Sequence, residues 1–189
     1  MSSGTSSPVP ILLTITIVLT IGIGTSYAVL TPTWQIPDEP AHYNYVRSLA
    51  EGRGLPVLEK GDYDQEYLRR LTSEGFPAGL SVEALEYEDH QPPLYYLLAT
   101  PIYLLSNGAV VALRILSVLL GAGLVVIAFG TVRAIFPARP ELALIAAAFV
   151  AFIPQHLSMM AGVNNDVLAE VAVGGTLWAL AVYVRGGRT

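Results

Sequence analysis

Carboxylates occur beside the apolar stretches of this chain, where they can do acid–base chemistry. Asp38 and Glu39 follow the first apolar stretch, and Asp166 precedes the last one. A carboxylate at such a position can act as a general base or bind a divalent cation. Asp38 can instead cap the helix that Pro40 begins, and Asp166 can cap the last apolar helix. The spacing alone leaves these alternatives open.

A second polar group, Glu88-Asp89-His90, leads directly into Pro92-Pro93 and an apolar segment. It offers oxygen and nitrogen atoms of the kinds that bind metal ions. Three adjacent side chains do not converge easily on one ion, so a polar hinge is the alternative interpretation.

Arg114 lies four residues inside a long apolar stretch, and no acidic residue is near it in the sequence. A charged side chain within such a stretch is a candidate functional residue. Its planar guanidinium suits a lipid phosphate. The sequence therefore predicts that Arg114 binds a phosphate, with simple extension of the side chain to the headgroups as the alternative.

Four apolar stretches can hold these residues in a membrane, which requires about 20 helical residues per crossing. They cover residues 10–30, 110–136, 142–157 with an extension to 160, and 167–184. Of the 189 residues, 53% are hydrophobic and 13% are charged, and there is no cysteine. This composition excludes a disordered chain and a basic nucleic-acid-binding protein, and it argues against a water-soluble one. We expect an all-α membrane protein with about four transmembrane helices, divided into residues 1–30, 31–109 and 110–189.

An acidic insert interrupts the apolar chain. Residues 31–91 hold 12 of the 15 acidic and 5 of the 10 basic residues, a net charge of −7. Short amphipathic helices are expected in it after Asp38, over 64–71 and over 81–87. They connect to the apolar segment Pro92–Leu105, which has 14 residues and three tyrosines. This segment is too short to cross comfortably, so it is predicted to lie at the membrane surface, with a tilted span as the alternative.

Basic residues predict the orientation. Arg133 and Arg139 flank one turn, Arg185 and Arg188 follow the last apolar stretch, and two apolar stretches separate the pairs. The positive-inside rule places both pairs in the cytoplasm. The N-terminus is then inside and the acidic insert outside, in what we expect to be a bacterial cytoplasmic membrane. Residues 1–8 contain no Lys or Arg, which favours a retained first helix over a cleaved signal peptide.

The order of these segments resembles the N-terminal part of C-type (GT-C) membrane glycosyltransferases, closest to the protein mannosyltransferase-like branch. The resemblance rests on IPDEPAHYNYVRSLAEGRGLPV, HQPPLYYLLATPIYLL, LRILSVLLGAGLVVIAFGTVRAIFP and PQHLSMMAGVNND. It extends over roughly residues 10–184. It implies a GT-C-like N-terminal module that transfers a sugar from a polyprenyl-phosphate-linked donor to an acceptor on the extracytoplasmic side.

The resemblance also implies roles for individual residues. The catalytic candidates are Asp38, Glu39 and Asp166, the same three that could hold a divalent cation such as Mg or Mn. The substrate-binding candidates are His90, Tyr95 and Arg114, near the lipid phosphate. The partners implied are membrane lipids and the sugar donor.

The departure from the family pattern is length, because such enzymes usually have more spans than four. The chain is therefore expected to be a fragment, a split enzyme completed by missing helices or a partner, or a non-catalytic structural subunit of a larger membrane complex. In the last case the acidic insert would be a docking surface for other membrane subunits.

Overall fold

The computed structural model describes residues 8–77 and 79–186, which form eight α-helices and no β-strand. The helices are α1 (Val9–Leu30), α2 (Glu39–Ala50), α3 (Gln65–Ser73), α4 (Leu94–Leu105), α5 (Val110–Ile135), α6 (Pro140–Ala151), α7 (Pro154–Met159) and α8 (Asp166–Gly186). The prediction of an all-α protein is confirmed.

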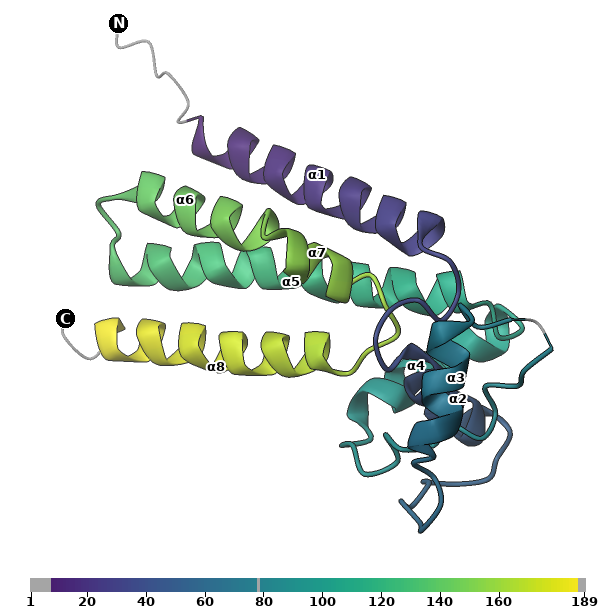
Figure 1. Ribbon diagram of the computed structural model, residues 1–189. Helices are drawn as coiled ribbons and strands as arrows, with labels where there is room; N and C mark the ends of the chain where they lie inside the picture. The colour runs from purple at the N-terminus through teal and green to yellow at the C-terminus, as the bar shows by residue number, and fades with distance from the viewer. Residues whose placement is uncertain (1–7, 78, 187–189) are drawn as a thin grey trace, which may run out of the picture.

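A bundle of long apolar helices forms one part of the molecule, with α5 at its centre. Helix α5 packs against α1, α6 and α8, and the four helices run side by side (Figure 1). Helices α1, α5 and α8 are each long and apolar enough to cross a membrane, which indicates an integral membrane protein. Small residues allow close packing on α5: a Cβ at Gly121 would collide with Met160, and one at Gly130 with Trp178.

The apolar stretch over residues 142–160 forms two helices instead of one. Helix α6 ends at Ala151, and α7 begins at Pro154. A proline disfavours the helical conformation of the residue before it, and Ile153 is accordingly extended, with ψ of 113°. The prediction of one helix over 142–157 is therefore wrong. The 12 residues of α6 span only about 18 Å, less than the hydrocarbon core.

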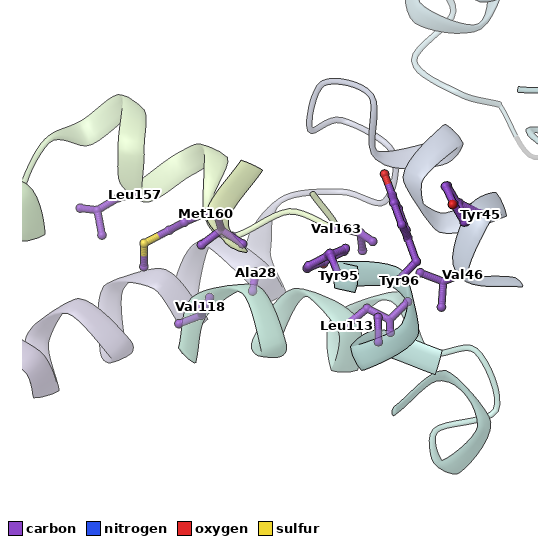
Figure 2. Close-up of a cluster of buried hydrophobic side chains, with 13 residues drawn as sticks. Ala28, Tyr45, Val46, Tyr95, Tyr96, Leu113, Val118, Leu157, Met160 and Val163 are labelled. Carbon is purple, nitrogen blue, oxygen red and sulfur yellow. The ribbon is translucent and has the colours of Figure 1, made fainter. Parts of the chain in front are cut away.

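The acidic insert (residues 31–91) and α4 gather at one end of the bundle, which we call the insert end. The loop between α7 and α8 lies at the same end (Figure 1). The predicted helices after Asp38 and over 64–71 correspond to α2 and α3, but residues 81–87 form turns instead of the third. Tyr45 of α2 stacks on Tyr96 of α4, with ring centroids 3.7 Å apart. Figure 2 shows both rings in the buried cluster that joins the insert to the bundle.

Both ends of helix α4 are held by tyrosines of α2. At its beginning, the Tyr45 hydroxyl donates to the carbonyl of Gln91 (3.3 Å), and just after its end the Tyr43 hydroxyl donates to that of Gly108 (2.8 Å). Its inner face, which includes Tyr95 and Tyr96, is buried. The opposite face exposes five leucines, namely Leu94, Leu97, Leu98, Leu104 and Leu105. An amphipathic helix with one such face suits the membrane surface.

This arrangement predicts that both ends of α4 are accessible from one side of the membrane. Cysteines introduced singly as Pro92→Cys and Asn107→Cys, both at exposed positions, should react with an impermeant thiol reagent from the same side. The chain has no natural cysteine to interfere. Reaction of the two positions from opposite sides would make α4 a transmembrane helix.

Candidate functional site

A buried ion pair connects the insert to the bundle. Arg114 donates from Nε to Oε1 of Glu39 (2.7 Å) and from Nη2 to Oε2 (2.6 Å). The two side chains are 1% and 0% exposed. The pair is bidentate, the strongest geometry available to these groups.

The remaining N–H groups of Arg114 hold the end of α1. Nη1 donates to the carbonyls of Ala28 (2.8 Å) and Thr31 (2.7 Å), and Nη2 also donates to that of Pro32 (3.1 Å). All five donors of the guanidinium are therefore used within the protein. Arg114 is thus paired with an acidic residue that is distant in the sequence, and in this conformation it offers no free donor to a phosphate.

Glu39 also accepts two backbone hydrogen bonds, so its carboxylate is a junction of four chain segments. The donors are the N–H groups of Trp34 (3.0 Å) and Val163 (3.2 Å). Glu39 thus contacts the loop before α8. A carboxylate held this way is a poor candidate for the general base, because an acceptor hydroxyl cannot reach it.

Asp38 has the opposite environment, although it is the adjacent residue. It is exposed, its φ of 60° is left-handed, and its side chain does not cap α2. Its Oδ1 instead accepts a hydrogen bond from the Tyr87 hydroxyl (2.9 Å). The helix-capping interpretation of Asp38 is therefore wrong. Asp38 is the accessible carboxylate of the pair.

The loop before α8 is fixed by polar contacts. Asn164 caps the helix by accepting from the N–H of Asp166 (2.7 Å), so Asp166, at the start of α8, is left exposed. The hydroxyl of Tyr95 accepts from the N–H of Asn164 (3.2 Å) and bonds Ser117 (2.8 Å). Tyr95 is 1% exposed, so its position suits holding this loop rather than touching a substrate as expected.

Asp38 and Asp166 act electrostatically on both His42 and Glu88 at the insert end, and we call Asp38, Glu88 and Asp166 the acid cluster. His42 is buried, and its Nδ1 lies 2.9 Å from the Tyr96 hydroxyl. Burial lowers the pKa of His42 to about 4, although Asp38 and Asp166 act to raise it. Burial raises the pKa of Glu88, and Asp38 and Asp166 add to that rise. Asp38 and Asp166 thus act on the same two groups although they are far apart in the sequence.

Other predicted residues have simpler surroundings. His90 is exposed, with Nδ1 3.0 Å from the carbonyl oxygen of Tyr87. In residues 8–77 and 79–186, no three His, Cys, Asp or Glu side chains are arranged to hold a metal ion. The candidate ligands Asp38, Glu39 and Asp166 therefore do not form a metal-binding group, because Glu39 turns inward to Arg114.

His42 and Tyr87 were not predicted from the sequence as parts of the site. In the sequence, His42 is one residue on the apolar face of the helix predicted after Asp38, and Tyr87 is one of ten tyrosines. Neither pattern indicates a functional site. Their hydrogen bonds join positions 54 and 49 residues apart, which no local pattern reveals.

Two cavities lie beside the acid cluster. One, of about 440 Å³, is lined by Asp166, Asn164, His156 and Glu170 together with apolar residues of α5 to α8. The other, of about 310 Å³, lies on the insert side and includes Asp38 and Tyr87. Each cavity therefore contains one carboxylate of the acid cluster.

The buried His42 predicts a pH-dependent stability. The unfolded chain binds a proton on His42 with the ordinary pKa of 6.5, and the folded chain only with a pKa of about 4. Between these values the unfolded state holds more protons, so the free energy of unfolding should fall by up to about 3 kcal/mol as the pH is lowered from 6.5 to 4. Thermal unfolding in detergent across this range measures the effect. The dependence should be shallower in His42→Gln and unchanged in the exposed control His90→Gln, and equal slopes in all three would contradict it.

Comparison with known proteins gives one match. Residues 90–189, more than half of the chain, match the model of a family described as dolichyl-phosphate-mannose-protein mannosyltransferase. The match contains His90, Tyr95, Arg114 and Asp166, whereas Asp38 and Glu39 precede it. No curated protein and no solved structure matches the chain.

Proposed function

Because the chain belongs to the dolichyl-phosphate-mannose-protein mannosyltransferase family, we propose that it is a GT-C-type module that transfers a sugar from a polyprenyl-phosphate-linked donor to a hydroxyl acceptor. The reaction takes place at the insert end, on the extracytoplasmic side of the membrane. The observation that carries the proposal is the exposed carboxylate of Asp38, which belongs to the acid cluster, while its neighbour Glu39 is buried in an ion pair.

Asp38 is the general base in this reaction. Its carboxylate takes the proton of the acceptor hydroxyl as that oxygen forms a bond to the anomeric carbon of the sugar. The bond from this carbon to the phosphate oxygen breaks, and polyprenyl phosphate leaves with the bonding electrons. The hydrogen bond from Tyr87 holds one carboxylate oxygen of Asp38 in a fixed direction, so the other is free for the proton.

Asp166 acts through its charge. Transfer from a glycosyl donor develops positive charge on the sugar ring, and nearby carboxylates stabilise such a charge. Asp166 and Asp38 both act electrostatically on His42 and Glu88, which supports a sugar position between them. No step is assigned to a metal ion, because these carboxylates do not converge as a ligand set.

The donor lipid lies along α4. The exposed leucines of this helix suit contact with a polyprenyl chain and the surrounding bilayer. His90 is the exposed candidate for the donor phosphate, since an imidazole N–H can donate a charge-assisted hydrogen bond to a phosphate oxygen. This assignment replaces Arg114 as the phosphate-binding group in the structure as it stands.

The test is a transfer assay with the full-length protein in liposomes. Polyprenyl-phosphate-linked mannose is the donor, and release of polyprenyl phosphate is measured with and without hydroxyl acceptors. Acceptor-dependent release is the expected result. A folded protein that neither binds nor consumes the donor would contradict the proposal and favour a structural subunit.

A further inference from the structure

The 310 Å³ cavity beside Asp38 is built by the insert rather than by the bundle. Its walls come from residues 34–38 and Pro40, from Leu68 and Thr72 of α3, and from Phe76 and Tyr87. All of them precede the region that matches the family model, which begins at residue 90. Whatever this cavity binds is therefore a property of the insert and not of the matched helices.

Unusual backbone conformations gather in this cavity. Four described residues other than glycine have a positive φ, and three of them line it: Trp34 (70°), Asp38 (60°) and Phe76 (56°). Such conformations are outliers for bulky side chains, cost about 1–3 kcal/mol each, and concentrate at functional sites.

Specific contacts hold the strained residues in place. The N–H of Trp34 is bound to Glu39 (3.0 Å), and the Trp34 ring packs edge-on against Tyr43 at 5.1 Å. The N–H of Phe76 donates to the carbonyl of Leu71 at the end of α3 (2.8 Å). The aromatic walls are thus anchored on the buried ion pair and on α3.

The chemistry of the lining selects a class of ligand. Trp34, Phe76 and Tyr87 offer aromatic faces, while Gln35 and Thr72 offer hydrogen-bonding groups and Asp38 a carboxylate. Aromatic faces suit the C–H face of a sugar ring, and the polar groups suit its hydroxyls. The Asp38 charge and the net charge of −7 on the insert disfavour an anionic ligand.

We propose that this cavity is the acceptor site and that it binds a neutral sugar with one hydroxyl directed at Asp38. The assignment of this sugar as the acceptor rests on the proposed function. Its binding does not, because binding requires neither the donor nor the transfer step. Trp34, Thr72 and Phe76 would then determine which acceptor is used.

Tryptophan fluorescence provides a direct test, because the chain has two tryptophans and only Trp34 lines the cavity. In a Trp178→Phe background, the full-length protein in detergent is titrated with methyl mannoside, with glucuronate and with a neutral threonine-containing peptide. Saturable quenching by methyl mannoside alone is expected. Stronger binding of glucuronate or of the peptide, or no saturable change with the mannoside, would overturn the proposal.

Two bulky substitutions on α3 give the matched comparison. Thr72→Phe fills the cavity and should weaken mannoside binding about tenfold or more, whereas Arg69→Phe, at an exposed position outside the lining, should leave it unchanged. Equal binding by both variants would overturn the cavity assignment.

If transfer occurs and Thr72→Phe leaves the acceptor KM unchanged, the acceptor site is wrong while the proposed function stands. If mannoside binds without any transfer, the cavity stands as a sugar site and the proposed function fails.

Discussion

Arg114→Leu is expected to lower the free energy of unfolding by about 3–5 kcal/mol, among the largest effects of any single substitution in this chain. The substitution leaves the Glu39 carboxylate buried without its charged partner. It also leaves the carbonyls of Ala28 and Thr31 without the donor they share. Arg114→Lys should recover little of this lost stability, because an ammonium group cannot form the bidentate pair or supply five donors.

A double substitution separates the cost of an unpaired charge from the value of the pair. Arg114→Leu combined with Glu39→Leu removes both charges, so the double variant should be more stable than either single one. The measurement is thermal or denaturant unfolding in one detergent, with Arg139→Leu as the control, because Arg139 is an exposed arginine paired with Glu141. Its effect should stay within about 0.5 kcal/mol.

The same variants test the phosphate role predicted for Arg114 from the sequence. If Arg114→Leu unfolds like the control but no longer binds polyprenyl phosphate, the guanidinium serves the lipid and the ion pair is not the main contribution to stability. Loss of stability with unchanged lipid binding by the folded fraction is the result that the structure supports.

The spans were predictable because about 20 apolar residues in a row have few alternatives to a membrane helix. The break between α6 and α7 also has a local cause, since Pro154 disfavours a helical Ile153, but an overall hydrophobic average conceals it. Residues 81–87 form turns although Val82 and Leu85 pack in a buried cluster, so a short amphipathic pattern alone does not predict a helix.

The site was predictable only at the level of topology. Counting the apolar stretches from the basic turns puts the acidic insert and the residues just before the last stretch on the same side of the membrane, and the hydrogen bond from the Val163 N–H to Glu39 agrees with this. Which acid of the Asp38-Glu39 pair faces the solvent was not predictable, because successive residues at a helix start point in different directions. Glu39 is the buried acid because it pairs with Arg114, 75 positions away, and no pattern within residues 31–91 predicts this pairing.

Asp38→Asn is expected to reduce sugar transfer by about 10²–10⁴-fold, the usual contribution of a general base, while the protein stays folded. Asparagine keeps the shape of the side chain and tolerates the left-handed conformation at φ of 60°. Its amide oxygen can still accept the hydrogen bond from Tyr87, so the substitution removes the basic oxygen and little else. The decrease should appear in kcat, because neither the donor nor the acceptor needs the negative charge for most of its binding.

The matched control for this substitution is Asp64→Asn, which also removes one negative charge from the insert. Asp64 caps α3 by accepting from the N–H groups of Glu66 and Tyr67, and an asparagine caps a helix about equally well. Transfer by Asp64→Asn should therefore match that of the unsubstituted protein. If Asp38→Asn keeps full activity while Asp166→Asn loses it, the proton acceptor is on α8 and the exposed first-loop carboxylate only shapes the cavity.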